Sequence, residues 1–260
     1  MGLFGRGKEK PAARTAGGSD ILRHGEAQPI DAADAAFYGE EIEAWMDAAF
    51  PGRSTSVWHE LASPDIHVDV YVMEPTQQEP YYVLYTVGMS ALPMTLENIA
   101  HPDQYGYLRR AELMMYLPAG FPLDQLRGAA GGDAPEEAYW PVRVLKSLAR
   151  LPHQYHTWLG AGHSVPNGDP AQPFAGTGFT GVVLFLPDEG NGPKQVLPVP
   201  TKDGGQVMLY LAVPVYPEEM AVKLRRGADT LEGDLLALGG GRGFMADPAR
   251  PNTSPGEGRP

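Results

Sequence analysis

The sequence predicts an α+β or mixed α/β protein built as one domain. Hydrophobic residues first recur at helical spacing, then alternate with period two, then return to helical spacing near the C-terminal end of the domain. Strands and helices therefore come in blocks, without the regular alternation of a doubly wound fold. The chain has 260 residues and is 43% hydrophobic, which is enough to bury a substantial core without metal or disulfides.

A helix is expected within residues 34–52. Asp34 is its expected N-cap, and Pro51 with Gly52 ends it. Apolar residues recur between these ends at helical spacing: Phe37, Ile42, Trp45, Met46 and Ala49.

A first block of strands follows this helix. Residues 66–72, IHVDVYV, alternate apolar and polar side chains and predict a half-buried strand. Residues 81–88 and 111–118 predict two further strands, the second of which ends at Pro118.

The second half of the domain begins with helical signals. A short helical turn is expected at 123–128 and a longer helix at 136–150, with Pro141 in its first turn, where a missing N–H costs nothing. One face of the longer helix is apolar: Val142, Leu145, Leu148 and Ala149. Strands at 179–187 and 206–216 and helices at 217–227 and 229–238 complete the domain.

Two tails flank this domain. Residues 1–33 are rich in Gly, Ala and charge without periodicity, and are expected to be disordered. Residues 239–260 are Gly/Pro-rich and are also expected to be disordered. The domain itself is expected to span residues 34–238.

Composition excludes several classes of function. The absence of cysteine excludes disulfides, thiolate zinc sites and a cysteine nucleophile. A net charge of -12 argues against a nucleic-acid partner, because such proteins neutralise phosphates with clustered Lys and Arg. The sequence has neither a secretory leader nor an apolar run long enough to span a membrane, so we expect a cytoplasmic protein with no membrane partner.

Residues 176–181, GTGFTG, match the dinucleotide-binding pattern G-x-G-x-x-G. In that motif a strand precedes the glycines and a helix N-terminus follows them. Here a loop precedes them and a strand follows, so we interpret the segment as a loop that leads into a strand. No cofactor is expected.

Histidines raise the question of a metal site. His67 and Asp69 share one face of the expected strand, but two ligands fall short of the three or four that zinc uses. His153, His156 and His163 form a looser group without an H-E-x-x-H pattern. No G-x-S-x-G elbow is present either, so we expect no metal and no catalytic residue.

Aromatic residues gather around the long helix: Tyr139, Trp140, Tyr155 and Trp158. Aromatic side chains are enriched at protein interfaces, although most pack in the core. An exposed strand edge is a second way to bind a peptide.

Six segments occur in an order that resembles the suppressor of fused domain. They are HVDVYV, YTVGMS, AELMMYLP, YWPVRVLKSLAR, GFTGVVLFLP and VPVYPEEM, and together they cover about residues 35–238. YTVGMS followed by ELMMYLP is the most characteristic pair. The resemblance implies an α+β fold with a mixed or antiparallel central sheet flanked by helices, in a single-domain member of the bacterial type.

The resemblance also implies a function. Animal members of the family sequester a hedgehog-pathway transcription factor by clamping an extended peptide between this domain and a second one. Bacterial members usually carry only this domain, and many look like immunity proteins of polymorphic toxin systems. Neither group is known as an enzyme family. We therefore expect a non-enzymatic domain that sequesters a protein partner. One form of this function is an immunity protein that neutralises a toxin.

This chain departs from the animal pattern. The second domain is not expected after residue 238. Leu151 stands where animal members have a tyrosine, and His163 stands where they have a peptide-pairing aspartate. We therefore expect a different partner from that of the animal proteins, bound by a region rich in aromatic and histidine side chains: Trp140, Leu151, His153, Tyr155, His156, Trp158 and His163.

Two alternatives remain open. One is an intracellular regulatory scaffold with no link to a toxin. The other is a metal-dependent hydrolase that uses His67, Asp69 and the later histidines.

For the binding protein, the acidic charge would speed capture of a basic toxin such as a nuclease.

Overall fold

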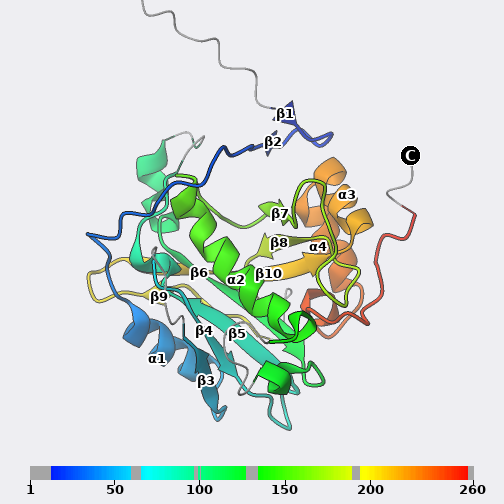
Figure 1. Ribbon diagram of the computed structural model, residues 1–260, viewed down its shortest axis with the longest axis horizontal. Coiled ribbons are helices and arrows are strands. Elements are labelled where there is room, and N and C mark those ends of the chain that lie inside the picture. The colour runs from blue at the N-terminus through cyan, green and yellow to red at the C-terminus, as the bar shows by residue number, and fades with distance from the viewer. Residues whose placement is uncertain are drawn as a thin grey trace, which may run out of the picture.

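A computed structural model describes residues 13–59, 66–96, 99, 101–126, 134–188 and 194–256. Within these residues the central feature is a mixed sheet of eight strands, in the order β3-β4-β5-β6-β10-β8-β7 with β9 paired to β10 (Figure 1). Neighbouring strands are antiparallel except for β6 and β10, which are parallel. The strands are β3 Thr55–Trp58, β4 Asp69–Met73, β5 Tyr81–Val87, β6 Ala111–Pro118, β7 Ser164–Pro166, β8 Gly181–Phe185, β9 Val199–Pro200 and β10 Gln206–Val215.

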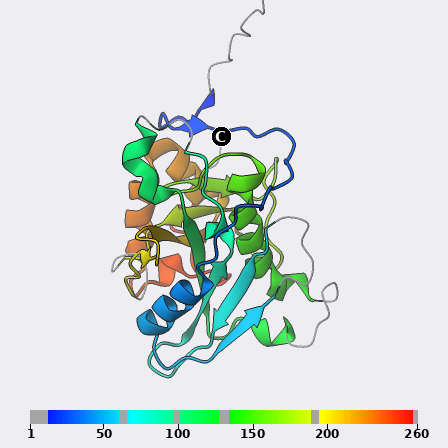
Figure 2. The same ribbon diagram turned by 90° about the vertical axis from the view of Figure 1, so that its left-hand side faces the viewer.

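Helices cover both faces of the sheet (Figure 2). One face packs against α2, and the other packs against α1, α3 and α4. Alternation along β6 explains the two cores, because Leu113 and Met115 point toward α2 whereas Met114 and Tyr116 point the other way. The helices are α1 Gly39–Ala49, α2 Glu136–Gln154, α3 Pro217–Arg226 and α4 Ala228–Leu236. The predicted α+β class is confirmed.

The predicted strand and helix cores lie close to the observed elements, but two details of the helices are wrong. Helix α1 begins at Gly39 after an N-cap at Tyr38, so Asp34 lies well before it. Pro141 lies beyond the first turn of α2, and Pro152 is also inside the helix. Both prolines are buried, which indicates that burial of the apolar face outweighs the lost backbone hydrogen bonds.

The glycine motif behaves as expected from its context. Residues 176–180 form a loop, and β8 begins at Gly181. Phe174 and Phe179 from this loop are buried in the core on the α2 side. Packing of the two phenylalanines fixes the loop against the core.

A buried carboxylate on β6 accepts hydrogen bonds from the end of β5 and from the turn that follows β5. Glu112 on β6 is fully buried, and five donors converge on its two oxygens. The hydroxyls of Thr86 and Ser90 donate at 2.6 Å, and the backbone N–H groups of Gly88 and Ser90 donate at 2.9 Å. The Met89 N–H adds a longer bond of 3.3 Å.

These donors oppose the effect of burial on Glu112. Burial raises the pKa of its carboxyl, while the hydrogen bonds from Ser90, Thr86 and Gly88 favour the ionised form. Gly88 is required here for two reasons. Its φ is 129°, and an added Cβ would lie 2.0 Å from the carbonyl oxygen of His67.

Residues 239–256 of the C-terminal segment pack against the domain, whereas the sequence predicts disorder from Gly239 onward. Residues 242–244 form a short helical turn, and Phe244 is buried with its ring against Phe185, 5.6 Å between centroids. Farther on, Arg250 forms a buried ion pair with Glu219 of α3 at 2.7 Å. The order comes from partners distant in sequence, which a Gly/Pro-rich composition does not reveal.

The N-terminal residues are described only from residue 13. Residues 1–12 of the expected tail lie outside the described residues. Beyond them, β1 Ala13–Arg14 and β2 Asp20–Ile21 form a small antiparallel pair with exposed side chains. Unlike the expected disordered tail, residues 13–28 contact the domain, as detailed below.

Replacement of Glu112 by alanine is expected to lower the free energy of unfolding by at least about 3 kcal/mol, because several buried donors lose their acceptor. Urea denaturation of the purified protein measures the change. Glu26→Ala, which removes an exposed carboxylate, is the control and should change stability by less than about 0.5 kcal/mol. A loss below about 1 kcal/mol in Glu112→Ala would contradict the assigned role.

Replacement of Arg250 by alanine is expected to cost about 3–5 kcal/mol, because Glu219 is left buried without its cation. The matched control is Arg242→Ala, which removes an exposed guanidinium from the same segment. The double variant Arg250→Met with Glu219→Met should recover part of the loss, since it removes both buried charges. Equal stability of Arg250→Ala and the control would show that the segment is not held by this pair.

Candidate functional site

The seven residues predicted to contact a partner divide into buried and accessible groups. Trp140 is fully buried and stacks on Phe174, with 4.9 Å between ring centroids. His153 is also buried, and its Nε2 lies 2.9 Å from the carbonyl oxygen of Met89. Both side chains therefore support the fold, and in this conformation neither offers surface to a partner. The residue pattern could not separate these buried side chains from the accessible ones, because an aromatic ring on a helix is common both in cores and at interfaces.

The remaining five residues are accessible to different extents. His156 is exposed, whereas Leu151, Tyr155, Trp158 and His163 are half-buried. They lie from the last turn of α2 to the residue before β7, and we call them the α2-end surface. The rings of Trp158 and His163 contact each other at 4.3 Å between centroids. The strand beside them, β7, is at one edge of the sheet and pairs with β8.

Two histidines in this region have a lowered pKa. Burial lowers the pKa of His153, the nearby Arg110 cation adds to the effect, and the bond to Met89 partly opposes it. Burial also lowers the pKa of His163, assisted by the charge of Lys223 on α3. Both rings are therefore held neutral near pH 7.

The N-terminal segment, residues 13–28, passes over the C-terminal end of α2 (Figure 1). The Gln28 N–H donates to the carbonyl oxygen of Gln154 at 2.9 Å, and the ring of His24 stacks on Tyr155 at 4.8 Å. At its other end, the Gly17 N–H donates to the carbonyl oxygen of Leu224 on α3 at 2.9 Å. A peptide segment thus already rests on part of the surface that the sequence predicts for a partner.

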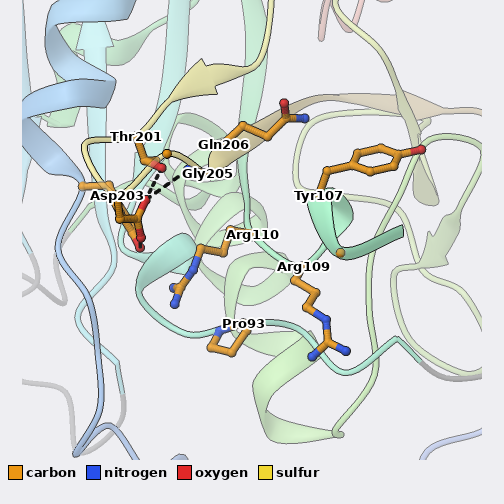
Figure 3. Close-up of a pocket in the computed structure, with 11 residues that line it drawn as sticks. Pro93, Tyr107, Arg109, Arg110, Thr201, Asp203, Gly205 and Gln206 are labelled. Carbon is orange, nitrogen blue, oxygen red and sulfur yellow. Dashed lines mark hydrogen bonds between the residues drawn. The ribbon is translucent and has the colours of Figure 1, made fainter. Parts of the chain in front are cut away.

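A pocket of about 580 Å³ lies elsewhere, between Pro93, residues 106–110 and the turn that connects β9 to β10 (Figure 3). Its walls include Tyr38, Tyr107, Arg109, Arg110 and Asp203. Hydrogen bonds from the Thr201 hydroxyl, the Tyr38 hydroxyl and the Gly205 N–H lower the pKa of Asp203 to about 2. No local sequence pattern indicates this pocket, because its residues come from segments far apart in the chain.

Residues at the opposite edge of the sheet form a group suited to a metal ion. His59, His67 and Asp69 place one potential ligand atom each within 4.8 Å of one another. The alternating sequence pattern indicates His67 and Asp69 but not His59, which follows a strand of only four residues. This group does not contain His153, His156 or His163, which the hydrolase hypothesis adds to His67 and Asp69.

Stability is expected to fall as the pH is lowered from 7.5 to 5.5, in part because of His153. Its pKa is depressed in the folded state, so below about 6.5 the unfolded chain binds a proton that the folded chain does not. This contribution is present above the unfolded pKa and is lost by up to about 1.4 kcal/mol per pH unit. Urea denaturation at both pH values should show a smaller loss for His153→Gln than for the wild type. An equal loss in the two proteins would contradict the assignment.

Comparisons with known proteins identify the fold. Residues 64–251 match the family model described as "Suppressor of fused protein (SUFU)". No curated protein matches the sequence. Among the described residues, no helix combines the length and the apolar character needed to cross a bilayer.

Solved structures support the same assignment. A chain from "the Sufu-Fu complex crystal structure" is 14% identical with a TM-score of 0.58, over 84% of this chain and 93% of that one. A putative SUFU homolog from Neisseria gonorrhoeae is 15% identical with a TM-score of 0.52, over 83% of this chain and 96% of that one. Drosophila Suppressor of Fused is 14% identical with a TM-score of 0.55, over 87% of this chain but 52% of its own length. The family match, which spans more than half of the chain, shows that this protein belongs to the suppressor of fused family.

Proposed function

We propose that this protein is a non-enzymatic binding domain that sequesters a protein partner at the α2-end surface. A structural neighbour was crystallised in a complex, the Sufu–Fu complex, which supports protein binding as a function of this fold. The observation that carries the proposal is the N-terminal segment, whose Gln28 and His24 use this surface as a peptide would. Backbone hydrogen bonding and ring stacking are both available there to an incoming chain.

The chemistry of the surface favours a protein partner over a small molecule. Tyr155 and Trp158 present aromatic faces with polar tips, a combination enriched at protein interfaces. His156 is exposed beside them. These side chains can bury area and donate hydrogen bonds, but they are not arranged as a nucleophile with a base.

The net charge of -12 favours a basic partner. Opposite charge speeds the encounter of two proteins and weakens with added salt. We infer that the partner is a basic protein toxin, such as a nuclease, which this domain neutralises by occupying its surface in the cytoplasm. An intracellular scaffold that binds a regulatory protein is the competing function, and the identity of the partner distinguishes the two.

The N-terminal segment would compete with such a partner. Few contacts hold it, among them an ion pair between Arg23 and Asp169 at 3.3 Å in which both side chains are more than three-quarters exposed. Ion pairs of this exposure contribute little to stability. A partner that binds more tightly than the segment can therefore displace it without unfolding the domain.

The test begins with the tagged full-length chain, which is used to capture a partner from the native host with a high-salt wash. Mass spectrometry identifies the captured protein, and calorimetry with the two purified proteins gives the Kd and stoichiometry. We expect a basic protein bound one to one. Tyr155→Ala and Trp158→Ala should each weaken binding at least about tenfold, as truncation of an interface aromatic does. Deletion of residues 1–28 should tighten it.

The matched control is Tyr107→Ala, which truncates an exposed aromatic at the pocket. It should leave the Kd unchanged, and circular dichroism should show that all variants remain folded. Unchanged affinity in Tyr155→Ala and Trp158→Ala, with a loss in Tyr107→Ala, would move the binding surface to the pocket. A captured enzyme complex in which this chain contributes turnover would overturn the proposed function itself.

A further inference from the structure

The edge of the sheet farthest from β7 carries the three side chains that could ligate a metal. Strand β3 pairs with β4 in an antiparallel register in which Thr55 faces Met73 and Trp58 faces Val70. If this register continues by one residue, His59 lies opposite Asp69. Directly opposed residues in such a pair have Cβ atoms about 4.5–5.5 Å apart. His59 and Asp69 are thus brought together by strand pairing.

The third residue is placed by the alternation of the chain before β4. His67 precedes Asp69 by two positions, so both side chains point to the same side. Burial confirms the alternation, because Ile66, Val68 and Val70 are buried while His67 is exposed. Three potential ligands, from the residue after β3, the segment before β4 and the first residue of β4, therefore lie on one side of the sheet edge.

The atoms of this group are already at near-ligand spacing. Nδ1 of His59 lies 2.9 Å from Oδ2 of Asp69, and Nε2 of His67 lies 2.8 Å from Oδ1. Two ligands on one zinc-sized ion, each about 2.0–2.2 Å from it, lie roughly 3 Å apart. An ion between the carboxylate and the two rings thus requires only small side-chain movements.

The geometry points to a site for one divalent transition-metal ion held by His59, His67 and Asp69. Two imidazoles and one carboxylate suit Zn²⁺, Ni²⁺ or Cu²⁺, whereas Mg²⁺ and Ca²⁺ prefer oxygen ligands throughout. The side chains of His59 and His67 are 64% and 56% exposed, so the ion can enter from solvent and keep water in its remaining positions. A neighbouring carboxylate, Glu43, accepts a hydrogen bond from Tyr71 and adds negative charge on the same side.

A bound ion would stabilise the pairing of the edge strand β3 with β4. Within the described residues, β3 pairs with β4 and with no other strand. A metal bridge from His59 to Asp69 and His67 would tie the end of β3 to β4. The site is independent of the proposed partner surface, because it lies at the other edge of the sheet and needs no partner protein.

Calorimetric titration of ZnCl₂ into the full-length chain, purified without a polyhistidine tag, tests the site. The wild type should bind one Zn²⁺ per chain. His59→Ala, His67→Ala and Asp69→Asn should each weaken binding at least about tenfold, the scale of loss seen when even a supporting residue of a metal site is removed. The control His101→Asn removes another exposed imidazole at a position with φ of 59°, which asparagine tolerates, and should bind zinc like the wild type.

A thermal melt provides a second readout. Zinc should raise the melting temperature of the wild type and of His101→Asn, EDTA should reverse the shift, and the three site variants should show no shift. Without metal, the wild type, His59→Ala, His67→Ala and His101→Asn should melt alike to within a few degrees, because the substituted imidazoles are exposed. Absence of saturable zinc binding by the folded wild type would overturn the proposal. Unchanged binding in His59→Ala, His67→Ala and Asp69→Asn would also overturn it.

Discussion

The buried carboxylate of Glu112 is the interaction on which the arrangement of the other elements depends. A carboxylate taken out of water is stable only when donors replace its hydration. Here they come from Thr86 at the end of β5 and from the turn at Gly88–Ser90. Glu112, the second residue of β6, thus fixes the path of the chain as it leaves the end of β5.

The same turn joins the other layers of the protein. Its Met89 carbonyl lies within hydrogen-bonding distance of His153 near the end of α2, and the Arg110 guanidinium donates to the Ser90 and Ala91 carbonyls. The Ala36 N–H, just before α1, also donates to the Ala91 carbonyl. One turn therefore links β6, α2 and the start of α1. The α2-end surface is held in place through this connection, because His153 lies only two residues before Tyr155.

A second buried charge has the same role at the other end of the chain. Glu219 on α3 is fully buried and accepts from Arg250 and from the backbone and hydroxyl of Thr253. Arg250 also donates to the Pro214 carbonyl on β10. In both places a buried glutamate accepts several hydrogen bonds from an irregular segment and so fixes that segment against the sheet or a helix. The two proposed sites lie at opposite edges of the sheet, with the α2-end surface beside β7 and the histidine–aspartate group beside β3.

The sequence alone determined the fold class, the main strands and helices and the family resemblance, because hydrophobic period and ordered motifs are local properties. It also predicted the alternation that puts His67 and Asp69 on one face. Tertiary structure decided which residues are accessible: Trp140 and His153 became core, while His59 joined the metal group through a strand pairing too short to recognise. It likewise ordered the Gly/Pro-rich residues around Arg250. Burial, the grouping of ligands and the order of the C-terminal segment all depend on contacts between segments distant in sequence. A local pattern of residue types does not specify which distant group a side chain contacts.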